Sequence, residues 1–228
     1  MSHNSHQLPG PEPAPHPTPL MQATVLMSFA VAIASLALFA WMASEMREGE
    51  VQHFDLAVRN WVHRFASPAM TTTMEAFSFI GSWVLGAAFA ISLAVFYKLR
   101  WRRAATWLIV TMAGALVLDL ALKYAFHRPR PTPFFGAVPG TWSFPSGHAL
   151  FSFCFYGVLA GLIIYRTRSL ALRIVIWCAA AVLVAAIGLS RIYLGVHYPS
   201  DVLAGYLAAA VWVTGMVAVD HWRSGRSK

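Results

Sequence analysis

Six runs of mostly apolar, nearly uncharged residues alternate with short polar segments along this chain of 228 residues. Each run is long enough for a helix to cross the hydrocarbon core of a bilayer, which is about 30 Å thick. Helices are favoured because they satisfy the backbone hydrogen bonds within the segment. The pattern therefore predicts an all-α integral membrane protein, a bundle of six transmembrane helices. The expected spans are residues 20–44, 70–97, 104–124, 147–165, 172–190 and 199–219.

The expected membrane domain covers residues 20–222 and leaves a short tail at each end. Residues 1–19 hold six prolines and three histidines but almost no apolar residues, so we expect a disordered tail with solvated histidines. Residues 223–228 form a basic tail. The first apolar run is too long for a signal peptide and follows no lysine or arginine, so we expect it to remain as a transmembrane helix.

Two segments between the spans are expected to lie at the bilayer surface. Residues 45–67 mix seven charged residues with apolar ones, which is typical of an amphipathic interfacial helix, although a solvated loop is the alternative. Residues 132–144 are rich in proline and glycine, so they cannot cross the bilayer. This second segment could cover a site as a lid, and both segments could set headgroup specificity.

Composition excludes a soluble domain, because 58% of the residues are hydrophobic and only 11% are charged. A net charge of +8 could indicate nucleic acid binding, but the arginines form short clusters between apolar runs, which is typical of cytoplasmic loops. Segments 98–103, 166–173 and 223–228 hold ten of the seventeen lysines and arginines. We therefore interpret the charge as a topology signal and expect no nucleic acid partner.

Six spans place both termini on one side of the membrane, together with these three basic segments. The positive-inside rule predicts that this side is cytoplasmic, so the opposite end would face the periplasm or the exterior across an inner (plasma) membrane. The first span alone favours the reverse orientation, because residues 1–19 contain no lysine or arginine whereas residues 45–67 contain three.

The stretch 190–201 places charged side chains among apolar residues. His197 precedes Asp201 by four residues, so the carboxylate can hold one ring nitrogen and make the other a better nucleophile or base. Arg191 adds a positive charge that suits attack on a phosphoryl group. Taken alone, the histidine and the aspartate fit a structural helix-capping pair equally well.

Two further motifs precede this stretch, one from Lys123 to Pro131 and one from Pro145 to His148. In chain order the three motifs are Lys-x6-Arg-Pro, Pro-Ser-Gly-His and Ser-Arg-x5-His-x3-Asp. A chain with this set resembles the type 2 phosphatidic acid phosphatase (PAP2) superfamily over about residues 70–219, with no signature position missing. That superfamily also contains soluble acid phosphatases and vanadate haloperoxidases, so the motifs alone do not define a substrate.

The resemblance implies that His197 is the nucleophile and forms a phosphohistidine, while Asp201 holds its other nitrogen. It also implies that His148 is the general acid, which protonates the leaving oxygen and later activates water. The residues alone do not say which histidine attacks. The phosphate-binding residues that we expect are Lys123, Arg130, Ser146, Gly147 and Arg191.

Local helix geometry supports part of that set. Ser146 and Gly147 begin the fourth span, so their backbone N–H groups and the helix dipole can point at an anion. Asp119 lies one helical turn before Lys123 on the same face, so we expect it to orient that lysine from outside the phosphate-binding set.

Few other charged residues are expected near the motifs. His127 and Arg128 occupy variable positions of the first motif, and we expect loop or headgroup contacts from them at most. Asp119 and Asp201 are the only carboxylates that we expect nearby, which is too few for a magnesium site. The sequence therefore predicts a metal-independent reaction without a cofactor.

We expect a membrane lipid phosphatase that removes the terminal phosphate of a lipid phosphate or an isoprenoid pyrophosphate. Undecaprenyl pyrophosphate is favoured, because three cationic side chains suit a diphosphate; phosphatidylglycerol phosphate, phosphatidic acid and lipid A phosphate fit the same clamp as alternatives. Six spans disfavour a haloperoxidase, and the presence of both histidines and the aspartate disfavours a transporter or scaffold. The sequence predicts nothing about oligomeric state.

Overall fold

Residues 19–226 are described by the computed structural model, with side chains from residue 23 to residue 222, and the regular elements of this part of the chain are all helices. The predicted N-terminal tail lies outside the described residues, apart from Pro19 at the start of the first helix. Most of the predicted basic tail at the other end is described only as backbone that continues the last helix.

Six helical stretches of the described chain are long and apolar enough to cross a membrane, which confirms the predicted six-helix bundle. Four are single helices, namely α1 (Pro19–Glu48), α5 (Arg102–Phe126), α8 (Leu170–Tyr193) and α9 (Pro199–Arg226). The other two run through a π-helical turn and comprise α3 (Pro68–Phe79), η1 (Ile80–Val84) and α4 (Leu85–Lys98), then α6 (Gly147–Ser152), η2 (Phe153–Gly157) and α7 (Val158–Arg166). Such turns occur frequently at functional sites.

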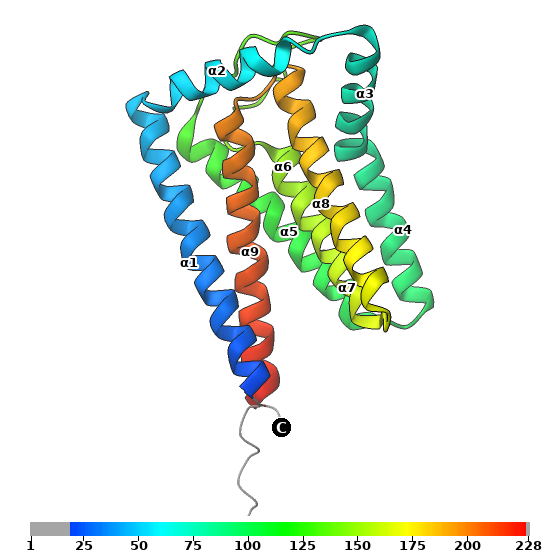
Figure 1. Cartoon of the computed structure of the whole chain (residues 1–228). Helices are drawn as coiled ribbons and strands as arrows, with labels where there is room; N and C mark the ends of the chain where they lie inside the picture. The colour runs from blue at the N-terminus through cyan, green and yellow to red at the C-terminus, as the bar shows by residue number, and fades with distance from the viewer. Residues whose placement is uncertain (1–18, 227–228) are drawn as a thin grey trace, which may run out of the picture.

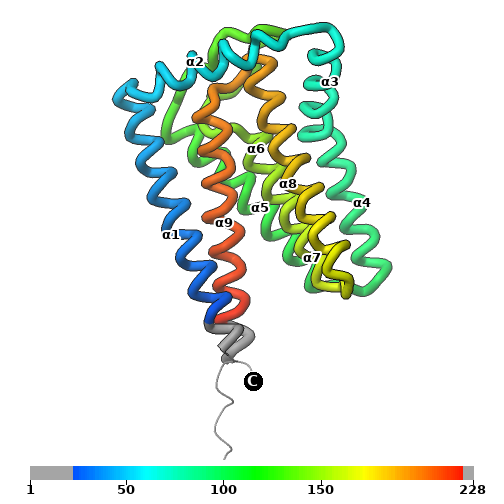
Figure 2. The backbone as a smooth tube through the Cα atoms, viewed as in Figure 1, coloured from blue at the N-terminus to red at the C-terminus, as the bar shows by residue number. Residues whose placement is uncertain are grey.

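The bundle has two distinct ends (Figure 1). The start of α1, the end of α9 and the turns after α4 and α7 all lie at one end, and the tube in Figure 2 shows the same two turns there. Helix α2 (Val51–His63) runs across the opposite end, above the connection between α8 and α9. The basic segments 98–103 and 166–173 therefore lie at the end of the bundle away from α2.

Helix α2 is amphipathic, as predicted, but its inward face is unusual. The residues that it buries are Asp55, Arg59 and Val62, whereas Phe54 and Trp61 are exposed. A charged residue is rarely buried without a partner, because leaving water costs it solvation free energy. The inward charges of α2 must therefore be paired with groups of the bundle.

Close helix packing brings the start of α6 against α9. A Cβ atom at Gly205 would lie 2.7 Å from the carbonyl oxygen of Ser146, so a larger residue would push the two helices apart. Along the spans the outer surface carries exposed apolar side chains such as Ile91 and Val182, which suits contact with lipid. Small residues at helix contacts are typical of membrane bundles.

Helix α5 ends at the first motif for a local reason. His127 adopts the left-handed conformation, with φ at 47°, and its N–H bonds the carbonyl of Lys123. Pro129 and Pro131 then prevent the helix from resuming. The chain therefore leaves the bundle end as an irregular segment that returns at Ser146.

Candidate active site

The connection between α8 and α9 holds the predicted nucleophile. Gly195 makes a turn with φ at +77°, and a Cβ atom there would lie 2.5 Å from the backbone nitrogen of Phe134. This turn brings His197 to the start of α9, where Nδ1 lies 3.4 Å from Oδ2 of Asp201. Both side chains are buried.

Three donors besides the histidine hold the carboxylate of Asp201. Its Oδ2 atom accepts hydrogen bonds from the backbone N–H of Tyr198 at 2.8 Å and from the hydroxyl of Ser143 at 2.5 Å. Its Oδ1 atom accepts from Nη1 of Arg128 at 2.7 Å. The carboxylate is therefore fixed on both oxygens, which leaves its orientation toward His197 little freedom.

Arg130 determines the tautomer of His197. Its Nη1 atom lies 2.9 Å from Nε2 of His197 and can only donate, so Nε2 is the acceptor and Nδ1 carries the proton that faces Asp201. Burial lowers the pKa of His197 to about 4, although the hydrogen bond and the charge of Asp201 oppose this shift. The ring is therefore neutral near pH 7, with the lone pair of Nε2 directed toward the cations.

Neighbouring residues hold the predicted phosphate clamps Lys123 and Arg130 in place. Lys123 contacts Asp119, as the spacing of one helical turn predicts. Arg130 is tied to the segment after the first motif, because its Nε atom donates to the carbonyl of Thr141 at 2.7 Å and Nη2 donates to the Thr141 hydroxyl at 2.8 Å. Both cations are thus positioned before any substrate arrives.

Two buried polar atoms of the predicted phosphate-binding set have no hydrogen-bond partner. They are the hydroxyl oxygen of Ser146 and Nε of Arg191, whose Nη1 atom donates to Ser78. Buried polar groups are nearly always satisfied, and exceptions often mark a ligand site. A bound phosphate between these atoms would supply the missing acceptor for the guanidinium and an oxygen for the hydroxyl to donate to.

The PSGH motif places His148 in the first turn of α6. Its ring lies against η1, where a Cβ atom at Gly81 would approach Cδ2 of His148 to 3.1 Å. The neighbouring Gly147 is equally constrained, since a Cβ atom there would lie 3.2 Å from Nζ of Lys123. The helix start thus contacts the lysine directly, and the glycine lets the backbone approach it.

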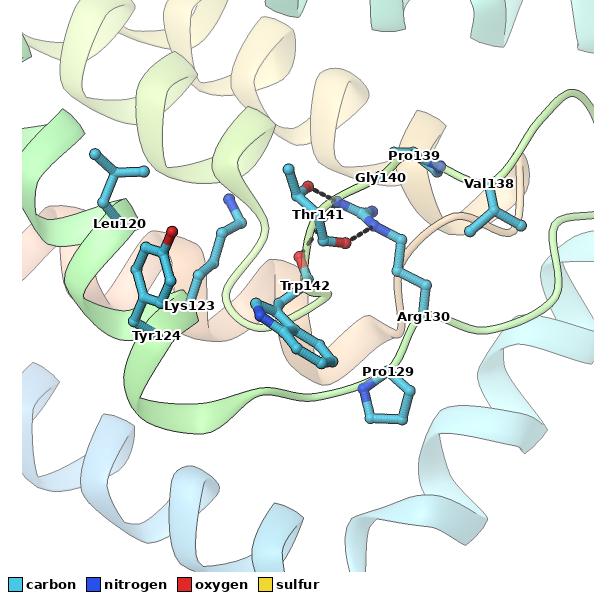
Figure 3. A pocket seen from close by; sticks show the side chains of 10 residues that line it. All are labelled: Leu120, Lys123, Tyr124, Pro129, Arg130, Val138, Pro139, Gly140, Thr141 and Trp142. Carbon is cyan, nitrogen blue, oxygen red and sulfur yellow. Dashed lines mark hydrogen bonds between the residues drawn. The ribbon is translucent and has the colours of Figure 1, made fainter.

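Two cavities lie close to the start of α6. One of about 420 Å³ is lined by Lys123, Arg130 and apolar residues of α5 and the following segment, among them Leu120 and Val138 (Figure 3). The other, of about 290 Å³, is lined by Gly147, His148 and Phe151 of α6 together with residues of η1, α4 and α5; these are Gly81, Ser82, Leu85, Gly86 and Met112. The second cavity is therefore mostly apolar and faces the general-acid candidate.

The segment 132–144 packs over the turn that carries His197. The backbone N–H of Phe134 donates to the carbonyl of Leu194 at 3.1 Å, and the Phe134 ring packs against both Arg59 and His63 of α2. This is the position that a lid would occupy; whether the segment opens stays a prediction.

Two expectations about charged residues near the motifs are wrong. Arg128 is not a loop or headgroup contact, because only 7% of it is exposed and it pairs with Asp201 and Asp55. Asp119 and Asp201 are not the only carboxylates nearby, because α2 brings Asp55 to the same place. A signal was present, since the spacing of Asp55, Arg59 and Val62 puts these residues on one helical face.

The comparisons with known proteins agree on one family. A family model described as the PAP2 superfamily matches residues 104–224. The undecaprenyl-diphosphatase of Sulfolobus acidocaldarius is 32% identical over 121 residues, which cover 50% of this chain and 54% of that protein. The decaprenylphosphoryl-5-phosphoribose phosphatase of Mycobacterium tuberculosis is 34% identical over 168 residues, covering 71% of this chain and 85% of that protein.

A solved structure supports the fold separately. The crystal structure of a transmembrane PAP2 type phosphatidylglycerolphosphate phosphatase from Bacillus subtilis matches with a TM-score of 0.75 and 24% sequence identity. The match covers 84% of this chain and 96% of that chain. The arrangement of helices is therefore shared along nearly the whole of that chain.

Proposed function

This chain belongs to the PAP2 superfamily and is a multi-pass membrane lipid phosphatase, and we propose that it acts through a phosphohistidine at His197. The observation that supports this mechanism most directly is the orientation of the His197 ring, with Nδ1 toward Asp201 and Nε2 beside Arg130. A nucleophile needs a lone pair that faces the electrophile, and the cations of the site define where a phosphate would lie.

The reaction divides into two displacements. In the first, the lone pair of Nε2 forms a bond to phosphorus, the bond to the leaving oxygen breaks, and His148 gives that oxygen a proton. In the second, His148 takes a proton from water, the water oxygen attacks phosphorus, and the electrons of the P–N bond return to His197. Lys123, Arg130 and Arg191 neutralise the non-bridging oxygens throughout.

Bound phosphate would also change the hydrogen bonds of the free site. Arg130 now donates to Nε2 of His197, and a phosphate oxygen would compete for that donor because it carries negative charge. The exchange releases the lone pair of Nε2 as the substrate arrives. Because three cations already supply charge neutralisation, we propose that the reaction needs no metal and survives EDTA.

We further propose that the substrate is a lipid whose phosphate reaches the site from the bilayer, with undecaprenyl pyrophosphate favoured. The apolar cavity beside His148 suits the lipid part of the leaving group, and the cavity beside Lys123 and Arg130 suits the phosphates of the substrate. Two relatives are named for isoprenoid substrates. Phosphatidylglycerol phosphate, phosphatidic acid and lipid A phosphate are the alternatives, since they present a terminal phosphate to the same cations.

A substrate panel tests this assignment. We expect kcat/KM for the preferred lipid in mixed micelles to exceed that for p-nitrophenyl phosphate by about 100-fold or more, because the soluble ester lacks the binding energy of the chain. Phosphate release by the purified protein is the measurement, across undecaprenyl pyrophosphate and the three alternative lipids. Comparable values for the soluble ester would overturn the lipid assignment, and a clear preference for phosphatidylglycerol phosphate would overturn only the isoprenoid one.

The basic segments at the end away from α2 support a topology with both termini in the cytoplasm and the site outside. We expect single cysteines at Ser5 and at Gly140, in a background without Cys154 and Cys178, to react from opposite sides of intact cells. Position 140 is exposed beside the site, so the cysteine of Gly140→Cys should react with an impermeant maleimide without permeabilisation. Reaction of Gly140→Cys only after permeabilisation would place the site in the cytoplasm.

A further inference from the structure

Two charged residues outside the predicted site are buried beside it. Asp55 of α2 has no exposed surface, and only 7% of Arg128 is exposed. Burying an unpaired charge is expensive, and replacing a buried ion pair by apolar residues is often neutral or stabilising. Stability alone therefore gives a weak reason for these charges, and their contacts suggest another.

Arg128 joins two carboxylates. Its Nη1 atom donates to Oδ1 of Asp201 at 2.7 Å, and its Nη2 atom donates to Oδ2 of Asp55 at the same distance. Nη1 also donates to the hydroxyl of Ser200 at 2.8 Å, and the guanidinium lies over the ring of Tyr198. Burial alone would lower the pKa of Arg128, but the two carboxylates outweigh it and raise the pKa, so the group stays charged.

Asp55 also holds the start of α9. Its Oδ1 atom accepts the backbone N–H of Ser200 at 2.9 Å, and its Oδ2 atom accepts the Ser200 hydroxyl at 2.6 Å. These contacts satisfy a backbone donor in the first helical turn, next to Asp201. Asp55 thus fixes both the backbone beside Asp201 and the guanidinium that binds its carboxylate.

We propose that Asp55 is a positioning residue of this phosphatase. It acts through Arg128 and Ser200 to fix the orientation of Asp201, and Asp201 in turn orients the ring of His197 for attack. Asp55, Arg128, Ser200 and Asp201 form the α2–α9 charge network. The proposal rests on His197 as the nucleophile. The physical reason is that Arg128 binds Oδ1 of Asp201, which prevents rotation of the carboxylate, so Oδ2 stays directed at Nδ1 of His197.

The contacts argue against Arg128 as a fourth phosphate clamp. Its hydrogen bonds go to Asp55, Ser200 and Asp201, and its charge is balanced by two carboxylates. The cavity beside the site is lined by Arg130 and Lys123 and not by Arg128. Losing Asp55 should therefore impair the chemical step and leave anion binding largely intact.

The test is Asp55→Asn, which keeps the shape of the side chain and removes its charge. We expect kcat for the preferred lipid to fall by about 10- to 100-fold, as for other groups that orient a reacting residue without touching the substrate. KM and the inhibition constant of inorganic phosphate, which binds the cations without a bond to His197, should change by less than about threefold, because Lys123, Arg130 and Arg191 are untouched. The matched control is Asp220→Asn, which breaks an exposed ion pair with Arg103 at the other end of the bundle.

Ser200→Ala is the second variant and decides the matter if Asp55→Asn fails to fold. It removes one hydroxyl of the network without unpairing a charge, so we expect a smaller loss of kcat, severalfold, with inhibition by inorganic phosphate unchanged. Unchanged kcat in both folded variants, or a rise in KM and in the inhibition constant of inorganic phosphate at constant kcat, would overturn the proposal. Wild-type protein that forms no phosphoenzyme would instead refute the proposed mechanism itself.

Discussion

The variant His197→Ala is expected to lose phosphate release almost completely, by on the order of 10⁴-fold or more, because a missing nucleophile cannot be replaced by positioning alone. The phosphoenzyme should disappear in the same variant. Both effects belong to one residue because Nε2 of His197 is the atom that faces the cations, while Nδ1 is held by Asp201.

The measurement is steady-state phosphate release together with rapid quenching under acid-free conditions, since the phosphoenzyme is expected to be a phosphohistidine. His53→Ala is the matched control, because His53 is an exposed histidine of α2 at the same end of the bundle. Substantial activity of His197→Ala in the presence of EDTA would show that another group attacks phosphorus.

Asp201→Asn gives a graded comparison with His197→Ala. The amide keeps the approximate shape of the carboxylate but not the charge that stabilises a positive ring during attack. We expect activity between that of the wild type and that of His197→Ala. Asp201 is buried and accepts hydrogen bonds from Ser143, Arg128 and Tyr198. The NH₂ group that replaces one oxygen in the amide cannot accept such bonds, so part of this set is lost as well.

The variant His148→Ala should show the second-largest effect, a loss of kcat of about 10²- to 10⁴-fold, which is the usual contribution of a general acid or base. Binding should suffer less, because His148 is not one of the cations that hold the phosphate. Orthovanadate inhibition is therefore expected to change little compared with turnover.

Leaving-group dependence separates the two roles of His148. The p-nitrophenolate anion leaves without needing a proton, so the first displacement should survive in His148→Ala, whereas activation of water in the second should not. We expect a burst of p-nitrophenol, then slow turnover with accumulated phosphoenzyme. Equal losses with lipid and p-nitrophenyl phosphate and no burst would remove His148 from the acid role.

Local sequence patterns determined the spans, because the length and apolarity of a run decide whether a helix can cross a bilayer, wherever its neighbours lie. The contact of Asp119 with Lys123 is local in the same sense, since four residues make one helical turn. The motifs identified the family and named the residues that converge at one end of the bundle. Their roles as nucleophile, acid and clamps remain proposals.

The α2–α9 charge network was decided only by the tertiary structure. Asp55 lies 73 residues before Arg128, which lies 73 residues before Asp201, and no local period connects positions so far apart. Periodicity indicated that Asp55 and Arg59 share a face of α2, but it could not say whether that face meets water or the bundle. In a membrane protein the ambiguity is greater, because lipid and protein core are both apolar and hydrophobicity does not mark the inward face of a span.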